Sequence, residues 1–110
     1  MTLNEYQKQA ARTISPGLTY EQTLTHALLE ISSEVGEVHS IFQKELQGHT
    51  VDPEDLRLEI GDVLWGLAEL CTTFGFEMDD IAERNIVKLK ERYPDGFDPE
   101  KSIHRKEYEK

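Results

Sequence analysis

Apolar side chains recur at steps of three and four residues through most of the chain. This period, typical of amphipathic helices, covers residues 20–46, 53–74 and 78–92, and a shorter stretch runs from Leu3 to about Thr13. No segment shows the strict alternation of a half-buried strand. The pattern therefore predicts an all-α protein with four helices, of which three are long.

The expected helix boundaries carry recognisable end signals. Thr19 and Gln22 have the spacing of a capping box at the start of the second helix. Asp52 followed by Pro53 is typical of a cap and a first helical position, and Gly75 is placed to end the third helix in the left-handed conformation.

The C-terminal segment contains two of the four prolines. Pro94 is expected to end the last helix, residues 95–99 to form a turn, and residues 100–110 to form a polar, frayed tail. We interpret residues 1–110 as a single domain with this tail from about residue 95. A chain of 110 residues is close to the lower limit for a self-sufficient core, so a four-helix-bundle-like protomer with a partner subunit is expected.

Charge and composition exclude several classes of protein. The formal charge of −10 argues against binding to a nucleic acid polymer, which needs a basic face. No apolar run approaches the length of a membrane span, and the N-terminus lacks the pattern of a signal peptide, so we expect a cytoplasmic protein without membrane contact. The single cysteine, Cys71, lies in an apolar run and is interpreted as a small core residue.

Two pairs of acids provide the first chemical signal. The members of each pair are three residues apart and share a helix face, so antiparallel packing of the two helices would bring four carboxylates together. Such a site needs protons or a cation, and oxygen ligands suit Mg²⁺, Mn²⁺ or Ca²⁺. Either pair alone is typical of a solvated face, but both contain or adjoin a glycine, Gly36 or Gly61, which suggests a close helix contact or ligand approach. The four acids are Glu34, Glu37, Glu59 and Asp62.

The last long helix supplies the opposite charge. Asn85, Lys88 and Arg92 follow one another at steps of three and four residues and form one polar, basic stripe. A stripe of this kind is usually a solvated face. Opposite an acidic, metal-loaded site it would instead bind phosphate oxygens, with lysine as a point charge and arginine as a bidentate donor.

Two further side chains lie near the acids in the helical pattern. Trp65 follows Asp62 by three residues and either fills the core or stacks against a nucleobase. His26 lies on the same stripe as Glu30 and Glu34, where it is either a plain surface residue or a ligand contact. The sequence contains neither a Glu-x-x-His motif nor a Gly-rich phosphate loop, which argues against a di-iron centre and P-loop chemistry.

Taken together, these motifs resemble the MazG-like all-α nucleotide pyrophosphohydrolases. The resemblance covers nearly the whole chain, and only the combination of its motifs is specific. Family members often carry two glutamates before the x-x-Glu, and here Ser33 occupies the first of those positions. The segments that carry the resemblance are residues 3–7 with Thr13, Glu34-x-x-Glu37, Glu59-x-x-Asp62 with the following residues 63–65, and Asn85-x-x-Lys88-x-x-x-Arg92-Tyr93-Pro94.

The resemblance implies hydrolysis of a nucleoside triphosphate to the monophosphate and pyrophosphate. It implies Mg²⁺, or Mn²⁺, held by the four acids named above. Lys88 and Arg92 would neutralise charge that develops in the transition state, and Asn85 would fix a phosphate or sugar oxygen. Either Glu34 or Glu30 would accept the proton of the attacking water.

The resemblance also implies a homodimer or a homotetramer, in agreement with the size of the chain. Two other functions stay open. The first is a non-catalytic helical interaction or regulatory module whose acids are solvated. The second is a metal-dependent phosphohydrolase of another specificity, acting on a phosphorylated metabolite or a nucleoside diphosphate.

Overall fold

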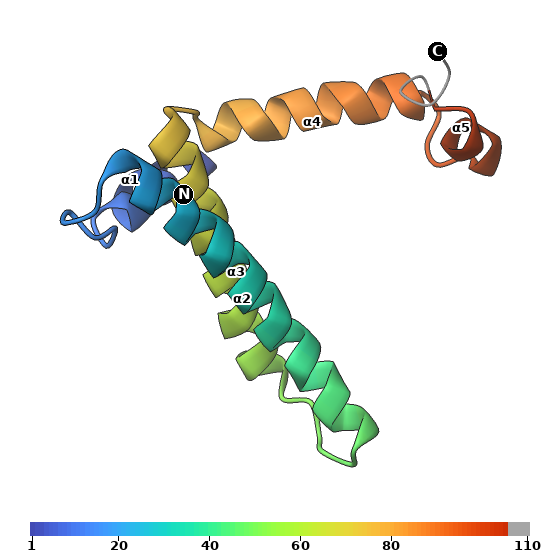
Figure 1. Ribbon diagram of the computed structural model, residues 1–110. Coiled ribbons are helices and arrows are strands. Elements are labelled where there is room, and N and C mark those ends of the chain that lie inside the picture. The colour runs from blue at the N-terminus through green and yellow to red at the C-terminus, as the bar shows by residue number, and fades with distance from the viewer. Residues whose placement is uncertain (106–110) are drawn as a thin grey trace. The chain divides into compact units, whose positions relative to one another are not determined.

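The computed structural model describes residues 1–105 and consists of helices (Figure 1). Within this part of the chain there is no strand, and the only pairing of extended backbone is an isolated bridge between Pro94 and Gly96. The prediction of an all-α protein is therefore confirmed. The helices are α1 (Leu3–Ala11), α2 (Tyr20–Leu46), α3 (Pro53–Phe74), α4 (Met78–Arg92) and α5 (Pro99–Ile103).

The helix ends are determined by local hydrogen bonds that the sequence signals predict. At the start of α2, the Thr19 hydroxyl accepts the Gln22 backbone N–H at 3.2 Å, and the Gln22 side chain accepts the Thr19 N–H at 3.1 Å. At the start of α3, the Asp52 carboxylate accepts the Glu54 N–H at 2.9 Å. Gly75 ends α3 with a φ of 74°, a left-handed conformation that glycine adopts without a steric penalty. These predicted boundaries are confirmed.

Two boundaries differ from the expectation. Helix α1 ends at Ala11 and not near Thr13, because the Thr13 hydroxyl donates to the Ala10 carbonyl at 2.7 Å and closes a turn there. The prediction of a frayed tail from residue 100 is also wrong for the part of the tail that the structure describes. The Asp98 carboxylate accepts the Glu100 N–H at 3.0 Å and starts α5, which runs to Ile103. The remainder of the expected tail, residues 106–110, lies outside the described residues.

The chain divides into two compact units, Met1–Met78 and residues 79–110. The first unit contains α1, α2 and α3, and the second contains nearly all of α4 together with α5. In the first unit α2 and α3 pack along each other as an antiparallel pair joined by a short loop, and α1 packs on α3 (Figure 1). The four-helix bundle and the single domain stay predictions.

The α2–α3 pair is in close contact at Gly66, which is buried. A Cβ atom on Gly66 would lie 2.9 Å from Ile31 Cγ1 and 3.3 Å from the Ile31 backbone nitrogen, so the helices could not keep this spacing with a larger residue. The small buried side chains Ala27 and Ala68 lie on the same two helices. By contrast, a Cβ on Gly36 or Gly61 would meet nothing within 4 Å, so a helix contact within the described chain does not explain these two glycines.

The first helix is fastened to the end of α3 by the side chain of Gln7. Its amide nitrogen donates to the Phe76 carbonyl at 2.8 Å and to the Thr72 hydroxyl at 3.3 Å. Its amide oxygen accepts the Met78 backbone N–H at 2.8 Å. One side chain therefore pairs with backbone groups between the end of α3 and the first residue of α4, and it ties α1 to that segment.

The chain by itself covers few of its large apolar side chains. The buried apolar residues of the described chain are small or flexible: Ala27, Ala68 and Met78. Several positions that the helical period assigned to the core are instead exposed, because the neighbouring helices of the unit leave that face open. These include Leu28, Phe42, Leu46, Ile60 and Leu67. None of the described helices has the length and apolar character needed to cross a membrane.

Candidate metal centre and adjoining cleft

Three of the four predicted acids meet where α2 and α3 face each other. Glu34 comes from α2, and Glu59 and Asp62 come from one face of α3. A carboxylate oxygen from each of them lies within 4.8 Å of the other two. Glu34 and Glu59 are half-buried and Asp62 is exposed, so the cluster is open to solvent on one side.

The surroundings of this cluster disfavour negative charge. Burial, followed by interactions with Glu30 and Asp62, raises the pKa of Glu34, and these effects outweigh a hydrogen bond with Glu59 that acts in the opposite direction. Burial and the neighbouring carboxylates also raise the pKa of Glu59. Glu34 and Glu59 therefore hold protons more tightly than ordinary carboxyls do, unless a cation replaces those protons.

The residues present fit a divalent cation. Glu59 Oε2 is buried and has no hydrogen-bond partner among the described residues. A buried carboxylate oxygen without a donor is costly, and coordination of a cation removes that cost. Three carboxylates from rigid helices are also the hard oxygen donors that Mg²⁺ and Mn²⁺ accept.

The fourth predicted ligand, Glu37, is outside this group of three. It is exposed one turn further along α2, and it lines a separate hollow with Lys44, Asp55 and Glu59. Its charge nevertheless contributes to the raised pKa of Glu59, so it belongs to the same electrostatic neighbourhood. Its role as a ligand stays a prediction.

A cleft of about 500 Å³ adjoins the acids. Asp62 belongs both to the cluster and to the wall of this cleft, which makes the two features continuous. Glu30, the other predicted proton acceptor, also lines it and interacts with Glu34. The complete lining consists of Thr13, Ser15, His26, Glu30, Asp62 and Trp65.

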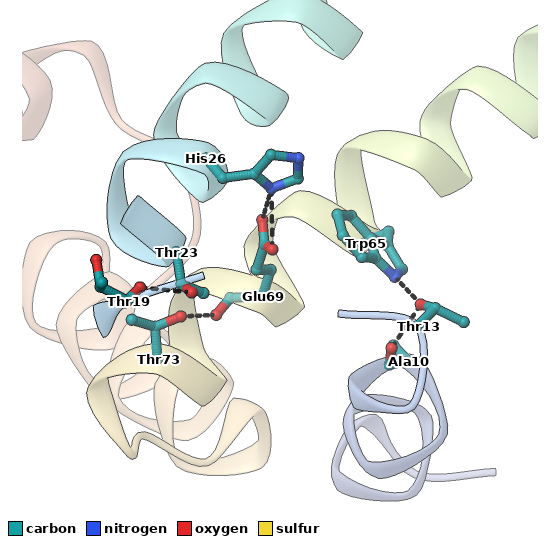
Figure 2. Close-up of polar contacts among 8 residues, drawn as sticks. All are labelled: Ala10, Thr13, Thr19, Thr23, His26, Trp65, Glu69 and Thr73. Atoms are coloured by element: carbon teal, nitrogen blue, oxygen red, sulfur yellow. Dashed lines mark hydrogen bonds and ion pairs between the residues drawn. The ribbon is translucent and has the colours of Figure 1, made fainter. Parts of the chain in front are cut away.

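Trp65 forms one wall of the cleft in a fixed orientation. Its indole Nε1–H donates to the Thr13 hydroxyl at 2.7 Å, and that hydroxyl donates in turn to the Ala10 carbonyl (Figure 2). The ring is half-buried. The two sequence-based interpretations of Trp65, as a core residue and as a ligand contact, are therefore compatible: one part of the ring packs on the protein and another part lines the cleft.

His26 forms another wall and is held by a residue that sequence reasoning missed. Its Nδ1 lies 2.7 Å and 3.0 Å from the two carboxylate oxygens of Glu69 (Figure 2). Glu69 is only 1% exposed, and the His26 ring meets the Trp65 ring edge-on with centroids 6.2 Å apart. The sequence signal that could have identified Glu69 was its position within the apolar run of residues 64–71, one turn beyond Trp65.

The predicted basic stripe lies on α4. Lys88 and Asn85 are exposed and Arg92 is half-buried near the end of the helix. These residues belong to the second compact unit, whereas the acids and the cleft belong to the first. Their approach to the acidic cluster stays a prediction.

These features define a class: a helical protein with a carboxylate cluster suited to a divalent cation, beside a cleft with aromatic walls. The family model of the MazG nucleotide pyrophosphohydrolase domain matches residues 22–97, which include α3, α4 and nearly all of α2. The chain therefore belongs to the MazG nucleotide pyrophosphohydrolase family, and the resemblance inferred from the motifs is confirmed. Comparisons with curated proteins and with solved structures found no match.

Proposed function

We propose that the protein is a Mg²⁺-dependent nucleoside triphosphate pyrophosphohydrolase, which converts the triphosphate to the monophosphate and pyrophosphate. The family supports an enzyme that hydrolyses pyrophosphate linkages. The observation that carries the proposal is the cluster of Glu34, Glu59 and Asp62, whose charges are not balanced within the described site. A polyphosphate brings its own divalent cation, which suits such a cluster.

In this proposal Glu34, Glu59 and Asp62 hold Mg²⁺, with Glu37 as the fourth ligand, and Mn²⁺ is the alternative ion. The bound ion supplies Lewis-acid charge to the phosphate oxygens. The half-buried position of Glu34 and Glu59 strengthens this electrostatic interaction, because less water screens it.

The chain supplies the proton acceptor and the positive charges. Glu30 or Glu34 accepts the proton of the attacking water; Glu30 lines the cleft and interacts with Glu34, so both carboxylates lie beside the proposed site of attack. Lys88 and Arg92 neutralise charge on the phosphates, and Asn85 binds a phosphate or sugar oxygen. For these three residues the support is their spacing on α4 and their position inside the segment that the family model matches.

The base of the nucleotide would occupy the cleft that Trp65 and His26 line. The cleft is continuous with the acids through Asp62, so a ligand in it can extend its phosphates towards the metal ligands. The indole ring offers a flat apolar face, and stacking of a base on such a ring tolerates different bases.

We also propose that the protein is a homodimer or a homotetramer. The support is the exposed apolar face of α2 and α3, where Leu29 is 65% and Ile60 53% exposed. Uncovered apolar area of this kind is typical of association surfaces. Light scattering at micromolar concentration tests the proposal, and a monomer would contradict it.

The decisive experiment is a turnover screen over canonical and modified nucleoside triphosphates with Mg²⁺, in which pyrophosphate and single phosphate are measured separately. Release of pyrophosphate supports the proposal. Release of single phosphate would favour a phosphohydrolase of another specificity. Absence of turnover together with absence of Mg²⁺ binding by calorimetry would favour the non-catalytic interaction module.

A further inference from the structure

We propose that Glu69 is a positioning residue: it orients His26 so that the imidazole Nε2 accepts a hydrogen bond from the exocyclic amino group of an adenine or cytosine base bound in the cleft. The observation is the juxtaposition of a buried carboxylate, an imidazole and a fixed indole ring in the cleft wall. The inference rests on the proposed function in one respect, namely that the ligand is a nucleotide.

The geometry of the pair determines which ring nitrogen carries the proton. Both oxygens of Glu69 lie within hydrogen-bond distance of the same atom, His26 Nδ1. An ionised carboxylate can only accept, so Nδ1 must donate. In the neutral imidazole this assignment leaves the lone pair on Nε2, which makes Nε2 an acceptor.

The burial of Glu69 makes the arrangement rigid. The carboxylate is 1% exposed and both of its oxygens lie within hydrogen-bond distance of His26 Nδ1, whereas the His26 side chain is 46% exposed. A buried carboxylate that lost its donor would carry a large desolvation cost. The imidazole is therefore held from its buried edge, while its other nitrogen has no hydrogen-bond partner in the described part of the chain.

The neighbouring wall, formed by Trp65, is held in the same manner. Trp65 donates its only N–H to Thr13, and the Thr13 hydroxyl uses its own proton on the Ala10 carbonyl. Each ring thus uses one nitrogen for a hydrogen bond within the protein, and part of each ring lines the same cleft. Both rings keep their orientation without the ligand, so less conformational freedom is lost when a base binds.

The two rings recognise different features of the base. Trp65 offers a π face, which does not distinguish bases by their hydrogen-bonding groups. His26 Nε2 offers a single acceptor, which distinguishes a base that places a donor there from one that does not. We therefore assign to His26 the preference for a base that carries a hydrogen-bond donor. We assign to Glu69 the fixed orientation of the His26 Nε2 acceptor.

The test compares triphosphates that differ by one exocyclic amino group: adenosine against purine riboside triphosphate, and cytidine against 2-pyrimidinone riboside triphosphate. We expect wild-type protein to bind the amino-bearing member of at least one pair about five- to tenfold more tightly, the value of one hydrogen bond. His26→Phe should raise KM for that member by this factor with little change in kcat, and the ratio within the pair should approach one.

Variants of Glu69 separate positioning from a purely structural role. Glu69→Leu should reproduce the loss of selectivity seen in His26→Phe, and the double variant should lose no more than either single variant. Glu69→Gln keeps an acceptor for Nδ1–H and should restore most of the selectivity. Glu45→Leu, the same exchange at an exposed position on α2 outside the cleft, is the matched control and should leave the KM ratio unchanged.

Three results would overturn the inference: a wild-type protein that does not discriminate within either pair, a His26→Phe variant with unchanged selectivity, or additive effects in the double variant. If either single variant does not fold, the double variant His26→Phe/Glu69→Leu still decides the question, because it removes the buried carboxylate together with its donor and leaves no unpaired buried charge; its selectivity is then judged in place of that of the variant that fails to fold. Wild-type protein that hydrolyses none of the triphosphates with Mg²⁺ would refute the proposed function itself. Active protein with unaltered variants would refute only the role of Glu69 and His26.

Discussion

Helix α3 carries two glutamates in opposite situations at the two ends of its contact with α2. Glu69 lies at the closely packed end, next to Ala68 and one turn from Gly66, and its carboxylate is matched by His26. Glu59 lies at the other end, near Gly61, where the neighbouring titratable groups are carboxylates and the pKa is raised. Both glutamates have buried oxygens, but only Glu69 finds its donor inside the described chain.

The comparison shows how one helix pair can use the same residue type for two purposes. Where a carboxylate has an internal donor, burial makes it a rigid support. Where carboxylates meet only one another, the site is left with a charge that a cation from solution must balance. The matched end, at Glu69, therefore determines the orientation of the His26 ring. The unmatched end, at Glu59, determines that the site binds a cation.

The largest expected effect is at the unmatched end. Glu59→Gln removes a charge from the cluster and should reduce pyrophosphate release by roughly 10³-fold, because electrostatic stabilisation of the transition state depends on the bound ion. Circular dichroism should show unchanged helix content. The matched control is Glu45→Gln, on an exposed part of α2, and substantial turnover of Glu59→Gln at saturating Mg²⁺ would contradict the assignment.

Binding of Mg²⁺ should stabilise the wild-type protein against unfolding. At a concentration one hundred times the dissociation constant, the expected gain in the free energy of unfolding is about 2.7 kcal/mol. The midpoint of thermal unfolding, followed during a Mg²⁺ titration, measures it. An equal shift in Glu59→Gln would mean that the ion binds elsewhere.

At the matched end, Gly66→Ala should lower the free energy of unfolding by about 1–3 kcal/mol, since the added Cβ meets Ile31 at 2.9 Å and overpacks the contact. Gly36→Ala is the control: nothing lies within 4 Å of that Cβ, so the exchange should stabilise the helix by up to about 1 kcal/mol. Urea unfolding of both variants measures the difference. Equal effects of the two exchanges would show that the helix pair is not tighter at Gly66.

The smallest effect concerns pH in the absence of metal. The folded pKa values of Glu34 and Glu59 are raised above the ordinary value of 4.5, so the folded state binds more protons than the unfolded state in the pH range just above 4.5. Stability contributed by these groups is present below pH 4.5 and is lost as pH rises through their raised pKa values. Urea unfolding in chelator from pH 4.5 upwards should show this loss in wild-type protein and a smaller loss in Glu59→Gln. Identical profiles would argue against coupling between the acids.

The helices and most of their ends could be predicted from the sequence because the responsible interactions are local. A cap such as Thr19 with Gln22, or Asp52 before Pro53, is complete within a few residues. The acidic pairs were also visible, since residues three apart must share a helix face. The short helix α5 was missed because Asp98 and Pro99 were interpreted as part of a turn, although Asp98 caps the next residues.

The core could not be predicted equally well. The helical period identifies an apolar face but not what covers it, so Leu28 and Ile60 were expected inside and are exposed in the single chain. The glycines show the same limit. A close helix contact or ligand approach was predicted at Gly36 and Gly61 because they neighbour the acids. The close helix contact is instead at Gly66, and only the register of α2 against α3 reveals it.

By itself, the sequence determined the helical class, the limits of the long helices and the family, all of which depend on local hydrogen bonds or on the order of residues along the chain. Only the tertiary structure decided that Glu34 meets Glu59 and Asp62, with Glu37 outside the group. It alone paired His26 with Glu69, which are 43 residues apart. The physical reason is that hydrogen bonds and charge interactions act over a few ångströms, and which distant side chains come that close depends on how the helices pack.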